Sequence, residues 1–282
     1  MSGGKKNIAC IGLGRMGTPM AVNMIQAGFE LSLFDVRTEM LKPLVDAGAR
    51  AAGSPKDAAA TADIVALIVV DDAQVESVLL GADGVFAGAR PGTIVAIHST
   101  VLPQTVRRLA QLGQERGIHV IDAPVSGGEA GVREKTLSYM VGGEAALLEA
   151  CRPLFSTSAA EIFHMGPLGA GAAAKALVQI VTCINMLAAH EAEVMAAANG
   201  LDFAVVQKML NKSAAQSFVV DNWLHRFKLA DDPMAIRRRR VEVFQKSLGP
   251  ALEMARELGI ELDGSALAQR LMPRIMGTAE KK

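Results

Sequence analysis

The chain has 282 residues, with 29 basic and 29 acidic side chains, and 50% of its residues are hydrophobic. That length suggests about two domains, and so high an apolar fraction excludes a disordered chain. The zero net charge gives no reason to expect a nucleic acid or a membrane surface as partner. The three cysteines are odd in number and far apart, so they indicate neither a disulfide framework nor a zinc cluster. We therefore expect a cytoplasmic protein.

Two further absences fit that expectation. The five histidines show no metal-ligand spacing, so no metal site is predicted. The longest apolar stretch, 176–189, contains Gln179 and Asn185 and is shorter than the roughly 20 residues that a membrane span needs. It predicts a buried helix.

The first 165 residues alternate strand-like and helix-like segments. The strand-like runs are 7–11, 31–34, 64–70, 93–97, 120–122, 138–141 and 162–164. Apolar spacing near 3.6 predicts helices between several of them, at 16–27, 73–80 and 104–116. Such alternation implies βαβ units and a mostly parallel sheet, so we predict a doubly wound α/β domain over 1–165.

The remaining residues, 166–282, contain no convincing strand. Residues 172–199 lack Pro and Gly, which predicts one helix of about 28 residues and roughly 42 Å. Helical segments follow at 203–210, 235–258 and 266–275. We predict an all-helical second domain over 166–282.

A glycine-rich turn follows the first strand and opens the first helix. Its G-x-G-x-x-G pattern suits a dinucleotide, because the glycines allow a tight turn, close backbone approach to a pyrophosphate, and helix–strand packing. A tight turn in an ordinary α/β fold is the structural alternative. Cofactor contacts are expected from Gly12, Leu13, Gly14, Arg15, Met16 and Gly17.

Asp35 closes the second strand, 18 residues after Gly17. A carboxylate there can hold the adenosine ribose hydroxyls and repel a 2′-phosphate, which favours NAD over NADP. Arg37 is close enough in sequence to offset that preference in part, so NADP stays possible. For Asp35 alone, a solvated strand end is the alternative.

A second glycine loop follows the strand that ends at Asp122. Ser126 offers a hydroxyl, and Gly127 and Gly128 expose backbone N–H groups, which together suit a carboxylate or an oxyanion. We therefore predict substrate binding by Ser126, Gly127 and Gly128. A plain glycine turn is the alternative.

Four segments in order resemble the β-hydroxyacid dehydrogenase family, which includes 3-hydroxyisobutyrate dehydrogenase and tartronate semialdehyde reductase. They are Gly12-Leu-Gly-Arg-Met-Gly-Thr-Pro-Met20; Asp122-Ala-Pro-Val-Ser-Gly-Gly128 with Met140-Val-Gly-Gly143; Gly166-Pro-Leu-Gly-Ala-Gly171 running into Lys175; and Gln245-Lys246-Ser-Leu248. The resemblance covers nearly the whole chain. It implies a Rossmann-type domain, a long interdomain helix, and a helical domain that dimerises.

The resemblance also implies roles for individual residues. Lys175 matches the general acid–base, which exchanges the proton of the substrate hydroxyl while hydride moves to or from the nicotinamide. Gln179, one helical turn further, matches a substrate-orienting residue. Lys246 matches a lysine over the nicotinamide end. The resemblance adds Val69, Val70 and Thr100 as cofactor contacts. For Lys175, Gln179 and Lys246 the alternative is an ordinary polar helix residue.

The sequence departs from the family pattern at three places. Gln179 stands where the family has Asn, Ser247 replaces the usual Asp, and Glu134-Lys135 replace a small residue and Gly. These departures put the family's common substrates in doubt more than its chemistry.

The run Arg237–Arg240 admits two interpretations. Four successive helical residues point in four directions, so they cannot all serve one site. The first interpretation is a solvated helix start with one or two salt bridges. The second sends one arginine to a second carboxylate or a phosphate on the substrate.

The sequence thus predicts an NAD-preferring dehydrogenase of small 3-hydroxy acids, forming a homodimer or homotetramer. An imine reductase on the same architecture is one alternative, although those relatives usually carry Asp or Tyr where Lys175 stands. A non-catalytic dinucleotide-binding sensor is another, kept open by Gln179 and Ser247. Residues 166–282 carry three more basic than acidic side chains, and residues 1–165 the reverse, which suits a small anionic substrate.

Overall fold

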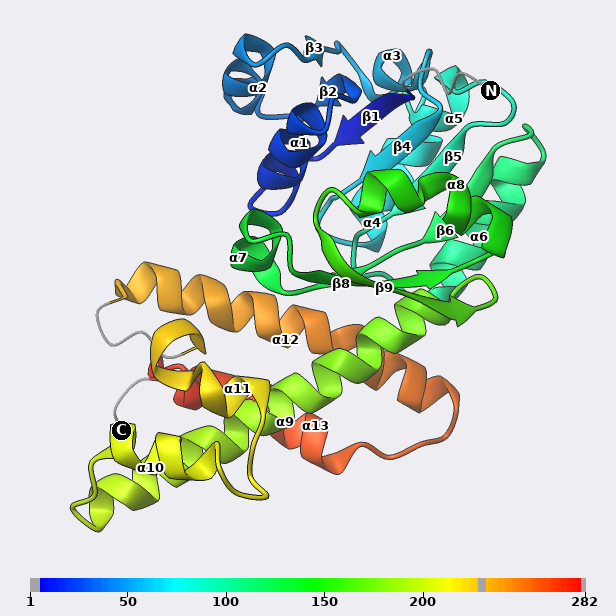
Figure 1. The fold of residues 1–282 in the computed structure, drawn as a ribbon. Helices are drawn as coiled ribbons and strands as arrows, with labels where there is room; N and C mark the ends of the chain where they lie inside the picture. The colour runs from blue at the N-terminus through cyan, green and yellow to red at the C-terminus, as the bar shows by residue number, and fades with distance from the viewer. Residues whose placement is uncertain (1–5, 228–231, 280–282) are drawn as a thin grey trace. The chain divides into compact units, whose positions relative to one another are not determined.

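The computed structural model describes residues 6–227 and 232–279, and the chain divides into two compact units, Met1–Lys175 and Ala176–Lys282 (Figure 1). The predicted boundary between residues 165 and 166 lies ten residues earlier. The difference arises because the first turns of the long helix are hydrogen-bonded to the first unit. Lys175 is therefore the last residue of that unit.

The first unit is built on one sheet, which has the order β3-β2-β1-β4-β5-β6-β8-β7 in the described residues, with β9 beside β8. From β3 to β6 every pairing is parallel, and β8 is antiparallel to β6 and β7. The strands are β1 (Asn7–Ile11), β2 (Glu30–Phe34), β3 (Arg50–Ala51), β4 (Ile64–Leu67), β5 (Ile94–Ile97), β6 (His119–Asp122), β7 (Val125–Ser126), β8 (Leu137–Gly142) and β9 (Ala159–Gly166). The strand order reverses beside β1, where the loops after β1 and β4 meet, and open α/β sheets generally bind their ligands at such a reversal.

Helices cover both faces of this sheet, as the alternation along β1 demands. Ile8 and Cys10 pack against one helical layer, and Ala9 and Ile11 pack against the other. The first layer is α1 (Gly17–Gln26), α2 (Lys42–Asp46), α7 (Gly128–Arg133) and α8 (Ala145–Phe155), and the second is α3 (Pro55–Ala59), α4 (Asp72–Leu80), α5 (Val85–Gly88) and α6 (Pro103–Gln114), with the short turn η1 (Thr38–Met40) before α2. The predicted doubly wound α/β fold is confirmed.

The second unit contains helices only in its described residues. The long helix α9 (Ala170–Ala198) begins in the first unit and continues here, close to its predicted span. It is followed by α10 (Phe203–Leu210), α11 (Phe218–Asp221), the π-helical turn η2 (Trp223–Phe227), α12 (Met234–Glu257) and α13 (Asp263–Ile275). A separate core joins them around Trp223, Leu248 and Met272, all fully buried. The predicted all-helical second domain is confirmed for these residues.

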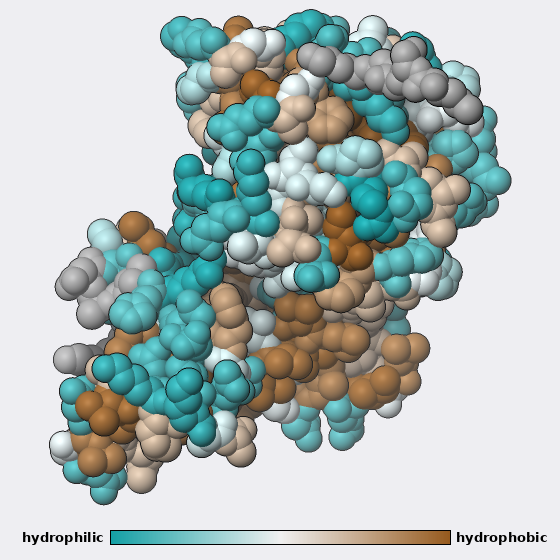
Figure 2. Space-filling model, viewed as in Figure 1, coloured by the Kyte–Doolittle hydropathy of each residue, from teal (hydrophilic) through white to brown (hydrophobic). Residues whose placement is uncertain are grey.

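Exposed apolar side chains are concentrated in the second unit. Two thirds of the exposed large hydrophobic residues of the described chain lie there, although it is the smaller unit, and brown side chains gather over it in Figure 2. Leu177, Val181 and Ile184 form one stripe along α9, at spacings of four and three residues. Among the described residues, α9 alone is long and apolar enough to cross a membrane, which is a weak indication because core helices pass the same test.

His98 is a buried residue that connects the ends of two neighbouring strands of the first unit. Its Nδ1 donates to the carbonyl oxygen of Ala123 at 2.8 Å, so β5 and β6 are tied together just beyond their last residues. Its ring meets Tyr139 and Phe155 edge to face, at centroid distances of 5.6 and 5.4 Å. Burial lowers the pKa of His98 to about 4, against the smaller opposing effect of the Ala123 hydrogen bond. The folded protein therefore keeps this ring neutral at pH 5 to 7.

This burial predicts acid-sensitive stability. Between pH 6.5 and 4 the unfolded chain binds a proton at His98 that the folded chain does not, so the free energy of unfolding falls as the pH falls. His98 should account for about 2 kcal/mol of the loss between pH 7 and 5, and His98→Gln should remove that part. Urea unfolding followed by circular dichroism at both pH values measures it. The matched control is His119→Gln, the same change at an exposed histidine.

Candidate active site

The loop between β1 and α1 is shaped by its three glycines. Gly12 has a φ of +92°, and a Cβ added to Gly12 or Gly17 would overlap backbone oxygens of Ile68 or Gly12. A Cβ added to Gly14 would meet nothing within 4 Å. Gly14 lies three residues before α1 and faces open space, next to a helix start whose first N–H groups have no partner within the helix. This local geometry fits a dinucleotide diphosphate.

Asp35 comes directly after β2 and is 7% exposed. Its Oδ2 accepts a hydrogen bond from the Leu13 N–H at 2.6 Å, which fixes the glycine loop against the end of β2. Arg37 donates to both carboxylate oxygens, from Nε at 3.1 Å and from its terminal nitrogen at 3.2 Å. Burial raises the pKa of Asp35, but the bonds from Arg37 and Leu13 outweigh it and hold the pKa below its ordinary value. The carboxylate is thus charged and partly covered by Arg37.

The ends of β4 and β5 lie beside this loop. The Ile68 N–H donates to the Ile11 carbonyl at 2.8 Å, and a side-chain carbon of Val69 lies within contact distance of the Gly12 Cβ position. The Val69 N–H donates to Ser99 Oγ at 2.9 Å, next to Thr100. The structure therefore brings Val69, Val70 and Thr100 to the same edge of the sheet as the glycine loop.

In the second glycine loop, as in the first, one glycine is closely packed and another faces open space. Ser126 lies at the end of β7, paired with Ser138 of β8. Gly127 and Gly128 both have positive φ, of 133° and 64°. A Cβ at Gly127 would press on the Leu137 side chain, whereas a Cβ at Gly128 would meet nothing within 4 Å. Gly128 is therefore open to a ligand, as Gly14 is.

An ion pair connects the two glycine loops. Arg15 Nε donates to the carboxylate of Glu129 at 3.2 Å, and Arg133 binds the other oxygen of Glu129 at 2.9 Å. Hydrogen bonds from Arg133 and Arg15 lower the pKa of Glu129. On the same pair of helices, α1 and α7, Asn23 donates to the Val132 carbonyl at 2.8 Å. The predicted diphosphate and substrate loops are therefore held side by side.

The helix start that precedes Lys175 is hydrogen-bonded to the end of β6. The carboxylate of Asp122 accepts hydrogen bonds from the N–H groups of Gly169 at 2.8 Å and Ala172 at 2.7 Å. Gly169 directly precedes α9 and Ala172 lies in its first turn, and Lys175 follows Ala172 by three residues. Lys175 is half-buried, between the buried Ala174 and Ala176.

Two predicted residues belong to the second unit. Gln179 lies on α9 four residues after Lys175 and is 8% exposed. Lys246 lies on α12 with an exposed side chain. Next to it, the Gln245 and Gln269 side-chain amides each donate to the other's backbone carbonyl, at 3.0 and 2.9 Å, which fixes α12 against α13.

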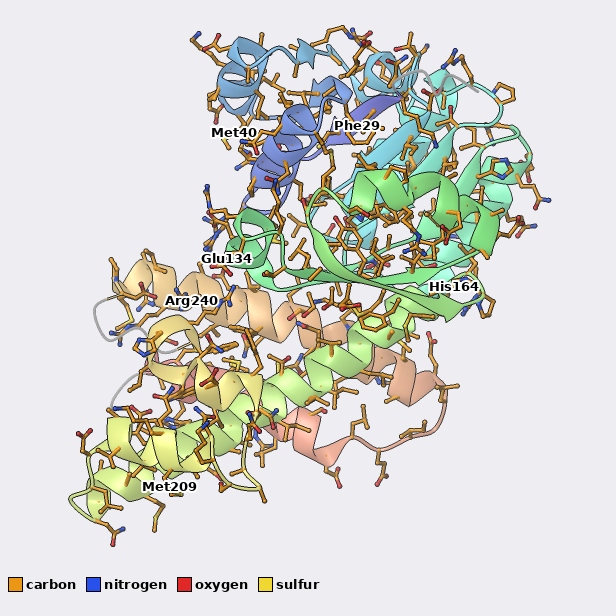
Figure 3. All side chains as sticks on the ribbon, in the orientation of Figure 1. Phe29, Met40, Glu134, His164, Met209 and Arg240 are labelled. Carbon is orange, nitrogen blue, oxygen red and sulfur yellow. The ribbon has the colours of Figure 1, made fainter. Side chains whose placement is uncertain are left out.

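Two of the four arginines in the run Arg237–Arg240 bind other protein groups, and the other two are exposed to solvent. Arg237 donates to the Asp232 carbonyl at 3.0 Å, and Arg240 pairs with the Asp232 carboxylate at 3.0 Å (Figure 3 labels Arg240). Arg240 also donates to the Arg226 carbonyl. Arg238 and Arg239 are exposed. This is the salt-bridged helix start that the sequence offered as the first interpretation.

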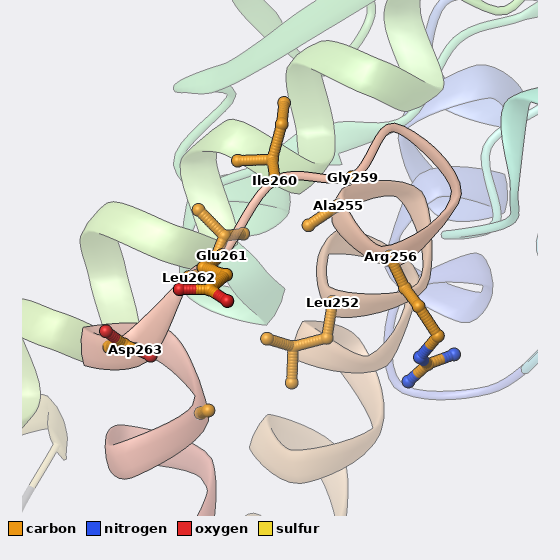
Figure 4. Close-up of a pocket in the computed structure, with 9 residues that line it drawn as sticks. Leu252, Ala255, Arg256, Gly259, Ile260, Glu261, Leu262 and Asp263 are labelled. Carbon is orange, nitrogen blue, oxygen red and sulfur yellow. The ribbon is translucent and has the colours of Figure 1, made fainter.

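A hollow of about 480 Å³ lies where the chain turns from α12 into α13 (Figure 4). Its wall is formed by Leu252, Ala255, Arg256, Gly259, Ile260, Glu261, Leu262, Asp263 and Ala266. None of the predicted site residues lines it, so it is separate from the candidate site.

Sequence reasoning gave no role to three residues that shape this edge. Asp122, Glu129 and Ser99 form the contacts described above, each with a partner at least 30 residues away. The one available signal was for Asp122, a carboxylic acid at the end of an otherwise apolar strand.

Comparisons with known proteins agree with this geometry. Residues 7–166 match the family described as the NAD binding domain of 6-phosphogluconate dehydrogenase. Residues 169–282 match the NAD-binding family of NADP-dependent 3-hydroxyisobutyrate dehydrogenase.

Individual relatives match between three quarters and nearly all of the chain. The NAD-dependent L-serine dehydrogenase of Pseudomonas aeruginosa is 41% identical over 216 residues, covering 77% of this chain and 72% of its own. The 2-hydroxy-3-oxopropionate reductase of Escherichia coli is 34% identical, covering 93% and 88%. Among solved structures, 3-hydroxyisobutyrate dehydrogenase of Mycobacterium tuberculosis with L-serine is 26% identical, with a TM-score of 0.84 over 97% of this chain and 94% of its own.

Gly14 has space for a methyl group and Gly17 has none, so alanine substitutions at these two positions should have different effects. Gly14→Ala should leave the melting temperature unchanged and weaken NADH binding by about tenfold or more, because its methyl group enters the space left for the diphosphate. Gly17→Ala should lower the melting temperature, because its methyl group meets the Gly12 carbonyl. Thermal unfolding and calorimetric titration with NADH separate the two. Unweakened NADH binding by Gly14→Ala would remove this loop from the cofactor site.

Proposed function

This chain belongs to the 3-hydroxyisobutyrate dehydrogenase family, and from that premise we propose that it transfers hydride reversibly between a nicotinamide cofactor and a small 3-hydroxy acid. The observation that carries the proposal is the placement of Lys175. It follows the anchored first turn of α9, in the unit that holds both glycine loops.

Each residue has a defined task in this reaction. The bound nicotinamide supplies the hydride acceptor in oxidation and the donor in reduction. In oxidation, Lys175 Nζ accepts the proton of the substrate hydroxyl as the carbonyl forms, and in reduction it returns that proton. The Gly127 and Gly128 N–H groups, with the Ser126 hydroxyl, bind the substrate carboxylate. Gln179 orients the substrate by its side-chain amide.

The substrate class follows from chemistry that the relatives' names share. L-Serine and 3-hydroxyisobutyrate both carry a hydroxymethyl group on the carbon next to a carboxylate. We assign this chain the same grouping, with L-serine and 3-hydroxyisobutyrate as the first compounds to assay. Gln179 is one methylene longer than the Asn that the family usually has, so it should favour a small substituent on that carbon.

Replacing Lys175 tests the proposal. Lys175→Ala should lower kcat by about a thousandfold, because a positioned acid–base typically contributes 10²–10⁴. The dissociation constant for NADH should stay the same. Steady-state rates on a panel of L-serine, 3-hydroxyisobutyrate, 3-hydroxypropionate, glycerate and threonate measure it, with the exposed Lys208→Ala on α10 as the matched control.

The outcomes separate the alternatives. Undiminished turnover by Lys175→Ala would contradict the assignment. Wild-type activity on cyclic imines, with none on hydroxy acids, would favour an imine reductase. Tight NADH binding without turnover of any panel member would favour a dinucleotide sensor.

We also propose that the enzyme prefers NAD and accepts NADP. The charged Asp35 carboxylate supports ribose binding and repels a 2′-phosphate. Arg37, which is bound to that carboxylate and about half-exposed, can turn toward a 2′-phosphate instead.

Two variants separate these opposing effects. Asp35→Asn keeps an acceptor for the Leu13 N–H but removes the charge, so it should raise the ratio of kcat/KM for NADP to that for NAD by about tenfold. Arg37→Ala should lower the same ratio. Initial rates with both cofactors measure it, and a ratio unmoved by Asp35→Asn would place the ribose elsewhere.

The exposed apolar surface of the second unit supports the predicted homodimer or homotetramer. We assign the stripe Leu177, Val181 and Ile184 to the contact between copies, since an isolated helix face this apolar is costly in water. Val181→Glu should shift the mass in sedimentation equilibrium toward the monomer. A wild-type monomer at micromolar concentration would refute the assembly.

A further inference from the structure

Among the described residues of the first unit, Asp122 has the most completely buried carboxylate. It is 0% exposed, and burial raises its pKa, against the opposing hydrogen bonds from Gly169, Ala172 and Gly171. Enclosing a carboxylate this fully is unfavourable unless its partners compensate. The three backbone donors supply that compensation, so the buried carboxylate depends on where residues 169–172 lie.

Glycines make the space around this carboxylate. A Cβ added to Gly142, on β8, would press on both Asp122 oxygens. A Cβ added to Gly171, in the first turn of α9, would press on the carboxylate and on the Met140 carbonyl. The end of β8 and the start of α9 thus pack tightly around the Asp122 side chain at the end of β6.

The Asp122 carboxylate contacts the N-terminal end of α9. It binds the N–H groups that an α-helix leaves unpaired at its first turn, and its charge opposes the positive end of the helix dipole. A helix held at both Gly169 and Ala172 can neither rotate nor slide at that turn. Lys175 projects less than one turn further along the same rigid backbone.

We propose that Asp122 is a positioning residue for the reaction: its buried carboxylate fixes the rotation and height of the first turn of α9 and thereby the direction of Lys175. The inference rests on the proposed acid–base role of Lys175. Asp122 itself contacts neither cofactor nor substrate in this assignment.

The test compares the effect of Asp122→Asn in two backgrounds, Lys175 and Lys175→Ala. Asn keeps one acceptor oxygen and loses the charge, so the side chain can no longer accept hydrogen bonds at both of its former oxygen positions. In the Lys175 background we expect kcat to fall tenfold or more, with the dissociation constant for NADH changed less than twofold. In the Lys175→Ala background, with ethylamine added as an untethered base, the same substitution should change the rate less than twofold.

A matched control accounts for lost stability. Thr93→Val removes a buried hydrogen bond to the Ala62 carbonyl at the opposite end of β5 and should leave kcat unchanged. If Asp122→Asn does not bind NADH, Asp122→Ser, which is smaller and uncharged, replaces it in the same comparison. Loss of folding in both variants would make Asp122 purely structural and overturn the proposal.

The remaining outcomes are distinct. An equal fall in both backgrounds, or no fall with Lys175 present, overturns the positioning role. Full activity of Lys175→Ala overturns the proposed function instead. An impaired Lys175→Ala with normal Asp122→Asn overturns the positioning role alone.

Discussion

The contact between the Asp122 carboxylate and the first turn of α9 is the constraint on which the rest of the candidate site depends. It joins the end of the central sheet to the helix that carries Lys175, and it extends the first compact unit to that residue. Because the carboxylate is buried, water cannot take its place as the hydrogen-bond acceptor for the N–H groups of Gly169 and Ala172. The glycines at positions 142 and 171 follow from it, since a larger residue at either would displace the carboxylate or the helix.

Around that contact, neighbouring loops are linked one to the next along a single edge of the sheet. Asp35 binds the first glycine loop, Ser99 binds the loop after β4, and His98 binds the segment after β6. The Arg15–Glu129 pair then closes the series onto the second glycine loop. An edge held in this way is organised before any ligand arrives, which reduces the entropy lost on binding.

The sequence predicted what depends on local pattern and missed what depends on long-range pairing. Alternating strands and helices were enough for the doubly wound sheet, and the absence of Pro and Gly was enough for α9. Short elements such as β3 and β7 have too few residues to form a period. Asp122 could be recognised as part of a motif, but its partners lie 47 and 50 residues away, and Arg15 and Glu129 lie 114 apart. No spacing rule reaches that far.

The arginine run bears on how an acid is recognised. Arg237 and Arg240, which share a side of α12, are engaged with Asp232, so their charge serves the fold of the second unit. The contacts of Arg237 and Arg240 therefore give the run a structural role and do not point to a substrate site. In the proposed function, a small carboxylate is held instead by the second glycine loop, where the Cβ position of Gly128 faces open space. If backbone donors of this loop hold the carboxylate, as we propose, then the substituent on the neighbouring carbon is what distinguishes one 3-hydroxy acid from another.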